Sequence, residues 1–509
     1  MPSESPKTTA AGSSYGQILK SSSILGGAQG VNLVLGLVRT KCVAVLLGPS
    51  GVGLIGLYSA ATGMIGTFSG LGIGQSGVRQ VAEAAVSGDR VRIARTVTVL
   101  RRVCWLTGAL GWLLTAVLAW PLSQWSFGRP EHAGAIAILG VTVLLGNIAA
   151  GQTSMLQGMR RIGDIARLQV SAVVVGTIIS ICLYALFLDR AIVPVLLVSA
   201  VINLSISFWF ARRIEIAPVQ ITWSETVAEA RGLVGFGIVF MWSALLTAAV
   251  ALLVQSLVRD RFGIEGNGIY QAAWSISGVF AGFILGAMGT DFYPRLTASA
   301  SDNAAVNRLV NEQTEVGILL ALPGLLATLC FSPWVIQMLY SARFAASSEL
   351  LPWFVLGVFG RVVSWPLGYV QLAKGAGRWF IVTESLFSAV QVLLVWAGIE
   401  FLGLRGAAMA FAALYALYIV GMLWTTARLS QFRWSASVVR LLSYSSVAVL
   451  GSFLLSQFLP TIPLAAVGGV LVLVVGVLSL RQLIRRVGTQ HRLARIPLRI
   501  PGLGPFLAR

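Results

Sequence analysis

The chain consists largely of apolar segments, each about as long as a lipid bilayer is thick. A membrane-spanning helix needs about 20 mostly apolar residues, and the 509-residue sequence holds about fourteen such segments. They lie near residues 22–45, 53–75, 103–122, 133–156, 168–188, 191–211, 232–258, 268–292, 316–340, 350–372, 379–402, 406–427, 441–459 and 464–480. Only 11% of the residues are charged, against about a quarter in soluble domains. The sequence therefore predicts an all-α polytopic membrane protein.

A set of residues from the first half of the chain recurs without gaps 215 positions later. The residues are Gly48, Gly51, Gly53, Gly63, Phe68 and Gly74, which recur as Gly263, Gly266, Gly268, Gly278, Phe283 and Gly289. Both copies cover a loop and the apolar segment after it. Parallel repeats of this kind build two similar lobes, and the substrate path of such transporters lies between the repeats. We therefore expect two pseudo-symmetric six-helix lobes.

The predicted order of domains follows from the repeat. The chain divides into a cytosolic N-terminal segment (1–21), an N-lobe of six spans (22–215), a C-lobe of six spans (230–428), an extra helix pair (441–480) and a basic cytosolic tail (481–509). The first twenty residues are polar and lack the apolar core of a signal peptide. We expect the first span itself to direct insertion.

The net charge of +19 is explained by topology. If the N-terminus is cytosolic and the helices alternate, most of the 37 Lys and Arg residues fall in cytosolic loops. Positive charge is retained on that side of the membrane during insertion. This distribution predicts that both termini are cytosolic and that nucleic acid is not a partner.

The sequence shows no signature of an enzyme. The predicted outer loops are about ten residues long, too short to form a domain that binds sugars and places catalytic acids. His132 and His491 lie in predicted loops, and there is no phosphate-binding GxxxxGK[ST] sequence. We expect no catalytic residues, no metal site and no cofactor.

Arg361 lies near the middle of the apolar segment 350–372. A guanidinium at the bilayer centre costs about 2.5–3.5 kcal/mol even on the lenient insertion scale. Its side chain must therefore face a wet cavity or a carboxylate. Trp365 and Gly368 share its helical face, which makes Trp365 a candidate glycan contact. We expect Arg361 to form an anion site in a central lumen, where it would bind pyrophosphate or an acidic sugar. The alternative is an interhelical ion pair that holds the two lobes together.

The first span carries a polar stripe. Gln29, Asn32, Gly36 and Arg39 fall on one helical face, and Lys41 follows. A stripe that faces the lumen would let Arg39 and Lys41 bind anions while Gln29 and Asn32 contact a glycan. Alternatively, the two cations reach the outer interface and the two amides bond a neighbouring helix.

Two further positions in the second half are candidates. Gln271 and Trp274 share a helical face that suits either a sugar ring or helix packing. Glu384 is an acid within a span, and it could protonate during ion coupling or pair with Arg361 or Lys374. A lumen with more Arg and Lys than carboxylate selects anions, and guanidinium groups offer paired donors to phosphate oxygens.

Three stretches, 46–83, 268–296 and 340–385, resemble a known family. They are similar to the lipid-linked oligosaccharide flippases of O-antigen and enterobacterial common antigen synthesis, within the multidrug/oligosaccharidyl-lipid/polysaccharide exporter superfamily. The resemblance covers about residues 15–430. It implies a two-lobed bundle with a V-shaped, cationic central cavity that opens alternately to each side. Arg361 takes the place of a basic residue of similar flippases, whereas Val358 stands where some relatives have an acid.

The resemblance and the residues together predict a flippase of the bacterial inner membrane. Its substrate would be an undecaprenyl-pyrophosphate-linked oligosaccharide, carried to the periplasmic leaflet for cell-surface polysaccharide assembly. We expect a monomer that contacts membrane lipids and works with a polysaccharide polymerase and a chain-length regulator. Two alternatives stay open: a drug/cation antiporter of the same superfamily, and a non-transporting scaffold of a polysaccharide synthesis complex.

Overall fold

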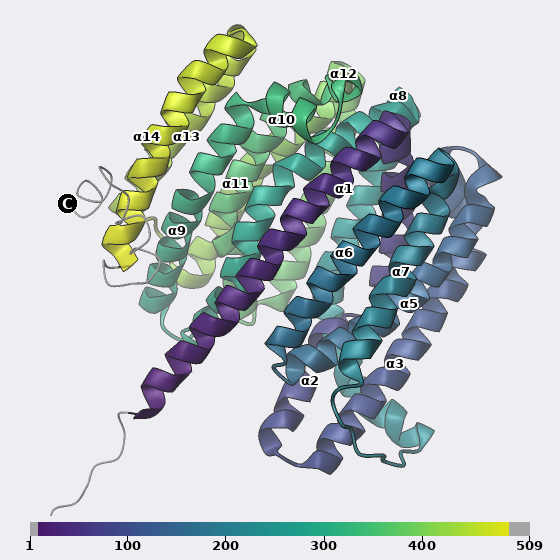
Figure 1. Cartoon of the computed structure of the whole chain (residues 1–509). Coiled ribbons are helices and arrows are strands. Elements are labelled where there is room, and N and C mark those ends of the chain that lie inside the picture. Colours follow the sequence, from purple (N-terminus) through teal and green to yellow (C-terminus); the bar gives the residue numbers. More distant parts are fainter. Residues whose placement is uncertain (1–8, 488–509) are drawn as a thin grey trace, which may run out of the picture. The chain divides into compact units, whose positions relative to one another are not determined.

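Every regular element of residues 9–487, the part of the chain that the computed structural model describes, is helical. Side chains are described from residue 27 onward, except at residues 75 and 487 and at some positions within 233–240 and 280–294. The helices are α1 (Thr9–Gly70), α2 (Ile73–Ser87), α3 (Arg90–Val117), α4 (Ala119–Phe127), α5 (Ala133–Gly158), α6 (Ile162–Phe187), α7 (Ile192–Ala211), α8 (Trp223–Ala298), α9 (Asn303–Cys330), α10 (Ser332–Leu339), α11 (Ser347–Ala373), α12 (Gly377–Ser430), α13 (Ala436–Phe458) and α14 (Thr461–Val487). Figure 1 shows them in chain order.

The chain forms two compact units, Met1–Ser256 and Leu257–Arg509. The division falls within α8, a helix that continues from one unit into the next. The lobe limits expected from the sequence, 22–215 and 230–428, stay predictions. The expected N-terminal segment begins, and the expected basic tail ends, outside the described residues.

The internal repeat is confirmed by the backbone. Gly48 interrupts α1 with φ 65° and ψ −168°, and Gly263 interrupts α8 with φ 71° and ψ −177°. This combination of angles is open to glycine and costly for other residues. In α1 the following Pro49 also lacks an N–H, which favours a break in the helix. The same glycine therefore bends the chain at the same point of each repeat.

Two further pairs of residues 215 apart share an unusual backbone conformation. Leu188 follows α6 with φ 49° and ψ −130°, and Gly403 bends α12 with φ 65° and ψ −151°. Arg160 and Gly375, which lie in the turns after α5 and α11, have φ values of 54° and 69°. In each pair one unit uses glycine where the other uses a larger residue. The repeat thus extends well beyond the stretch that is visible from shared glycines.

The helix order also repeats. The helices α3 and α9 are both 28 residues long. Each begins after an aspartate that caps its N-terminus: Asp89 accepts a hydrogen bond from the N–H of Val91, and Asp302 accepts one from the N–H of Ala304. Such caps satisfy N–H groups that have no partner within the helix. A short helix, a 3₁₀ turn and a long helix then follow in both units.

Ten helical segments of residues 9–487 are long and apolar enough to cross a membrane. Three of them have 44, 50 and 54 residues, more than twice the roughly 20 that one crossing needs. Gly48, the turn at Leu188 and Gly403 interrupt these three segments. The expectation of an all-α polytopic protein is confirmed, and the count of fourteen crossings stays a prediction.

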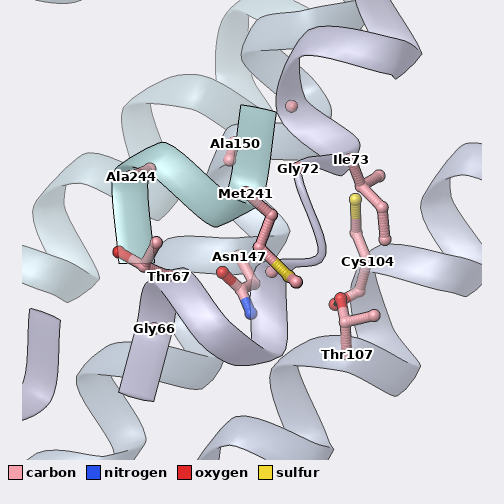
Figure 2. Close-up of a pocket in the computed structure, with 12 residues that line it drawn as sticks. Gly66, Thr67, Gly72, Ile73, Cys104, Thr107, Asn147, Ala150, Met241 and Ala244 are labelled. Atoms are coloured by element: carbon pink, nitrogen blue, oxygen red, sulfur yellow. Dashed lines mark hydrogen bonds between the residues drawn. The ribbon is translucent and has the colours of Figure 1, made fainter. Parts of the chain in front are cut away.

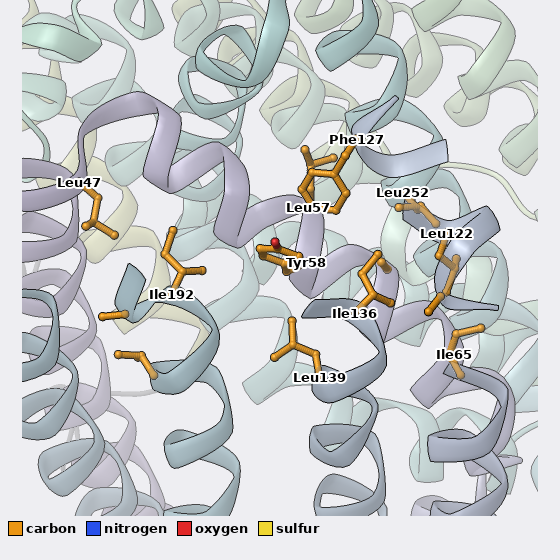
Figure 3. Close-up of a cluster of buried hydrophobic side chains, with 14 of the residues drawn as sticks. Leu47, Leu57, Tyr58, Ile65, Leu122, Phe127, Ile136, Leu139, Ile192 and Leu252 are labelled. Atoms are coloured by element: carbon orange, nitrogen blue, oxygen red, sulfur yellow. The ribbon is translucent and has the colours of Figure 1, made fainter. Parts of the chain in front are cut away.

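The core of the first unit is built where the second half of α1 meets α4, α5 and α7 (Figure 3). Tyr58 lies among the buried side chains of Phe127, Ile136 and Ile192. The Tyr58 hydroxyl is 2.7 Å from Nδ1 of His132, and the imidazole stacks on the Phe127 ring with centroids 4.1 Å apart. His132 is therefore explained by local packing.

The helix pair α13–α14 is an integral part of the second unit, where it packs beside α9 (Figure 1). Glu315 of α9 is buried, with 8% of its side chain exposed. Its carboxylate accepts hydrogen bonds from Arg486 at 3.1 Å and from Gln482 at 3.0 Å, both on α14. Because a buried carboxylate needs such partners, α14 completes the environment of α9.

Candidate substrate-binding site

Arg361 has an unusual position on α11. Between Leu350 and Ala373, where the structure describes every side chain, it is the one exposed residue. None of the ion pairs found among the described side chains includes Arg361. A guanidinium within an apolar span is costly unless water or an anion meets it. The exposed position therefore suits an anion-binding cation.

Glycines bring α12 close to this arginine. A Cβ added to Gly357 would lie 2.3 Å from the ring of Phe411, and one added to Gly360 would lie 2.9 Å from Cβ of Tyr415. Small residues at helix contacts let backbones approach in this way. As a result, Tyr415 and Tyr418 of α12 lie within the electrostatic range of Arg361.

Glu384 lies on the other side of the same tyrosines. It is half-buried on the first half of α12, and its Oε1 accepts a hydrogen bond of 3.2 Å from the Tyr418 hydroxyl. It also acts electrostatically on Tyr415. The structure thus brings the predicted residues Arg361 and Glu384 to one cluster, linked by tyrosines rather than by an ion pair of the kind the sequence left open.

Lys374, the other partner considered for Glu384, is engaged elsewhere. Its Nζ donates to the backbone carbonyl of Ala300 and to Oδ1 of Asn303, both at 2.5 Å. These contacts tie the end of α11 to the loop after α8 and to the first residue of α9. Lys374 is therefore explained by loop packing.

Trp365 lies one helical turn from Arg361 and is half-buried. Its ring centroid is 4.7 Å from that of Tyr369 and 5.9 Å from that of Phe292. The indole therefore forms part of an aromatic surface next to the cation on α11. Its predicted contact with a glycan stays a prediction.

Gln271 and Trp274 lie in an aromatic cluster of the second unit. The Trp274 ring meets Phe354 and Phe411 edge to face, with centroids 5.5 Å and 4.8 Å apart. Oε1 of Gln271 is buried without a hydrogen-bond partner in the structure. The contacts of Trp274 support the helix-packing alternative that the sequence left open. For Gln271, the unpartnered acceptor leaves room for a ligand donor.

The polar stripe of α1 lies in the first unit. Gln29 is exposed and donates a 3.4 Å hydrogen bond to Gln169 of α6, and Oδ1 of Asn32 is buried without a partner in the structure. Arg39 is half-buried and hydrogen bonds to Tyr184. Lys41 is half-buried as well. Gln29 thus makes the bond to a neighbouring helix that was the alternative to a lumen contact.

Sequence reasoning missed Tyr415 and Tyr418, which connect the two predicted charges. The glycines at 357 and 360 directly precede Arg361 and indicate a close helix neighbour. That signal was available, but it does not identify which helix comes close. Only the fold places α12 there.

A second missed cluster joins α3 to the beginning of α8. The Arg95 guanidinium donates to Glu225 at 3.0 Å and also to Glu229. Arg102 donates at 2.8 Å to the hydroxyl of Thr226. From the sequence alone, these arginines count only as positive charges that fix the membrane topology. In the structure they clamp the first turns of α8 onto α3.

Two units that repeat one helix order, each built of membrane-length helices, define a repeat-built transporter of the membrane. Arg361, which is exposed on the mostly buried helix α11, is the candidate cation for binding its substrate. Residues 18–300 match the family described as "Polysaccharide biosynthesis protein". Since that is more than half of the chain, the protein belongs to this family.

The similar proteins agree with this assignment. The lipid III flippases of Escherichia coli (strain K12) and Shigella flexneri are each 24% identical over 405 residues, which cover 76% of this chain and 93% of each relative. A solved structure of the lipid II flippase MurJ in an inward closed conformation matches with a TM-score of 0.68 at 13% identity, over 91% of this chain and 99% of that chain. An inward-facing multidrug resistance MATE transporter of the MOP superfamily matches with a TM-score of 0.58 at 16% identity, over 79% and 96%. The family resemblance and the predicted fold class are confirmed.

Proposed function

We propose that the protein flips a polyprenyl-pyrophosphate-linked oligosaccharide from the cytosolic to the periplasmic leaflet of the bacterial inner membrane. Alternating access of the two repeated units would carry the head group, for use in cell-surface polysaccharide assembly. Support comes from the family and from the relatives named lipid III flippase. The undecaprenyl tail would stay in the lipid during transport.

The observation that carries the proposal is the exposed Arg361 on α11. A pyrophosphate offers paired oxygens that match the donors of a guanidinium. Arg39 and Lys41 of the first unit are the other proposed anion contacts. Gln29, Asn32, Gln271, Trp274 and Trp365 are the proposed glycan contacts, and among them the unpartnered carbonyl oxygens of Asn32 and Gln271 are the best supported.

Glu384 is the proposed residue for ion coupling. A half-buried carboxylate that accepts a hydrogen bond from Tyr418 can take up a proton or hold a cation. When an anion neutralises Arg361, the electrostatic environment of Glu384 changes through the shared tyrosines. This arrangement supports a coupling scheme that does not need an acid at Val358.

We further propose that both termini are cytosolic and that the protein works as a monomer. The proposed partners are membrane lipids, a polysaccharide polymerase and a chain-length regulator. The protein would act as a transporter without catalytic residues, metal or cofactor.

A drug or cation antiporter is the less favoured alternative. It would centre its site on a carboxylate, whereas the exposed charge of α11 is a guanidinium. A non-transporting scaffold would not need Arg361 at all. Arg361→Ala separates both alternatives from the proposed function.

The test uses mass spectrometry of polyprenyl-linked lipids from cells that lack the protein. We expect an oligosaccharide-pyrophosphate lipid to accumulate, to clear with wild type and to persist with Arg361→Ala. The mass would also identify the glycan. If no such lipid accumulates, or if Arg361→Ala clears it as wild type does, the proposed function is wrong.

A further inference from the structure

The first unit contains a cavity of about 210 Å³ where α1, α2, α3, α5 and α8 meet. Its lining residues are uncharged: Gly66, Thr67, Gly70, Gly72, Ile73, Gly74, Cys104, Thr107, Asn147, Ala150, Met241 and Ala244. Ala150 and Ala244 are exposed, so the cavity is open on their side. Figure 2 shows the side chains of Asn147 and Met241 in the space between the surrounding helices.

The polar groups of the cavity suit hydroxyl-bearing ligands. Asn147 donates a weak 3.3 Å hydrogen bond to Ser69. Its Oδ1 lies over Gly70, where an added Cβ would be 3.5 Å away. The hydroxyls of Thr67 and Thr107 donate to carbonyls of their own helices, at 2.9 Å and 3.3 Å. All three side chains can therefore still accept hydrogen bonds from a ligand.

One lining position of this cavity carries a large aromatic residue in the second unit. The chain leaves α5 and α11 through identical backbone hydrogen bonds: the N–H groups of residues 159, 160 and 161 repeat at 374, 375 and 376, and their carbonyl acceptors repeat at the same spacing of 215. With this register, Ala150 corresponds to Trp365 and Ser154 to Tyr369. Trp365 and Tyr369 pack against each other and against Phe292. At this position the first unit therefore has a small residue that borders the cavity, where the second unit carries an indole ring.

Charge differs between the units in the same register. Arg361 corresponds to Gly146, so the cation is present only in the second unit. A binding site for pyrophosphate would gain from the charged unit. A cavity with an amide, two hydroxyls and the thioether of Met241, but no charge, suits a neutral polar ring with one apolar face.

We propose that this cavity of the first unit binds an uncharged sugar residue of the lipid-linked oligosaccharide. The inference rests on the proposed function and names a subsite for it. Asn147, Thr67 and Thr107 bond the sugar hydroxyls, and Met241 and the glycine backbones contact the apolar face of the ring.

The test fills the cavity with the residue that the second unit carries. In cells whose native protein is replaced by Ala150→Trp, more lipid-linked oligosaccharide should accumulate than in cells with the wild-type protein. Its control is Ile138→Trp, which adds a tryptophan at an exposed position of the same helix. If Ala150→Trp supports transport as well as the control does, the subsite does not exist. Asn147→Leu, which keeps the branched shape of the native side chain and removes its hydrogen-bonding groups, provides a second variant in case the tryptophan prevents folding.

A binding measurement separates this inference from the proposed function. Saturation-transfer NMR on the purified full chain in lipid nanodiscs would use N-acetyl-D-glucosamine as the uncharged probe and 1-hexanol as the alkyl probe. We expect saturation transfer to the sugar in wild type and in Arg361→Ala. Asn147→Leu should reduce this transfer about tenfold, which corresponds to the loss of one or two hydrogen bonds. Ala150→Trp should also reduce it, because the indole takes up space in the cavity. Absence of transfer to the sugar in wild type overturns the proposal, as does equal transfer in Ala150→Trp. A loss that affects hexanol alone would identify an alkyl site and also contradicts it. If the sugar binds as expected but cells lacking the protein accumulate no lipid-linked oligosaccharide, the proposed function fails by itself.

Discussion

The Tyr418 hydroxyl donates a 3.2 Å hydrogen bond to Glu384 while it lies within the electrostatic range of Arg361. The two predicted charges of the second unit are thus connected through a neutral side chain. An anion bound at Arg361 would be sensed at Glu384 without direct contact between the two residues. This geometry makes the tyrosine separable from both charges by mutation.

Tyr418→Phe should weaken coupling while it preserves binding of the head group. The substitution removes one hydrogen bond, so we expect Glu384 to respond less to an anion at Arg361 and transport to lose part of its dependence on an ion gradient. Glu384→Gln should remove that dependence fully. Transport measured in proteoliposomes with and without a pH or sodium gradient checks both variants. Equal gradient dependence in wild type and Glu384→Gln would exclude Glu384 from coupling.

Arg361→Ala should lower transport strongly without preventing folding. The side chain is exposed and outside the ion pairs of the described residues, so its loss should change the free energy of unfolding by about 0.5 kcal/mol or less. Loss of a charged hydrogen bond to phosphate, about 1.5–3 kcal/mol, should lower transport by roughly 10- to 100-fold. Arg361→Lys keeps the charge without the paired donors and should recover part of the activity. Thermal unfolding and lipid analysis of the two variants test this.

Leu188→Gly should stabilise the protein. Leu188 holds a left-handed φ of 49° that its repeat partner Gly403 adopts as glycine. A left-handed conformation costs a non-glycine residue about 1–2 kcal/mol, so the substitution should raise the free energy of unfolding by about 1 kcal/mol. The converse Gly403→Leu should lower it by a similar amount. Unfolding measured for both variants would contradict the repeat argument if they shifted in the same direction.

Arg486→Ala should destabilise the second unit because it leaves the buried carboxylate of Glu315 with fewer partners. We expect a loss of about 1–3 kcal/mol, the cost of an unsatisfied buried group. Glu315→Gln combined with Arg486→Ala should lose less than the sum of the two single variants. A double-mutant cycle by thermal unfolding measures this, and strict additivity would show that the pair does not interact.

Glu225 should give the clamp on α3 a pH dependence. Hydrogen bonds from the backbone and then the hydroxyl of Thr222, followed by Arg95, hold the pKa of Glu225 below its ordinary value. A lowered pKa means that the stabilisation is complete above the ordinary glutamate pKa and is lost as the pH falls through the lowered one. Wild type should therefore unfold at higher temperature than Glu225→Gln at neutral pH, and the two should converge in acid. A difference that stayed constant or grew in acid would contradict the assignment.

Much of the fold follows from the sequence because bilayer-length apolar segments and repeated glycines are local signals. Gly48 followed by Pro49 predicts a break in a helix by itself. Gly263 has no such neighbour, so only its place in the repeat reveals that the chain bends there. The positive φ of Leu188 could not be predicted, because leucine itself disfavours this conformation.

The candidate site was partly predictable for a similar reason. A single arginine within an apolar segment stands out in a sequence, and the structure places Arg361 where it is exposed. The roles of Tyr415, Tyr418 and Asn147 depend on which helices meet, and that information is not local. Trp274 shows the converse: its residue type suggested a ligand contact, and its neighbours Phe354 and Phe411 surround it with other aromatic rings.

The central claim is that this chain moves a pyrophosphate-linked oligosaccharide across a bilayer with the help of Arg361. The most direct test reconstitutes the purified full chain in liposomes that contain an undecaprenyl-pyrophosphate-linked oligosaccharide. A glycosidase added outside can cleave the oligosaccharide of the inner leaflet only after it has been flipped to the outer leaflet. We expect wild type to expose the inner pool and Arg361→Ala to leave it protected. The account would be contradicted if the inner-leaflet oligosaccharide were as protected with wild type as in protein-free liposomes. It would also be contradicted if Arg361→Ala exposed this oligosaccharide as fully as wild type does.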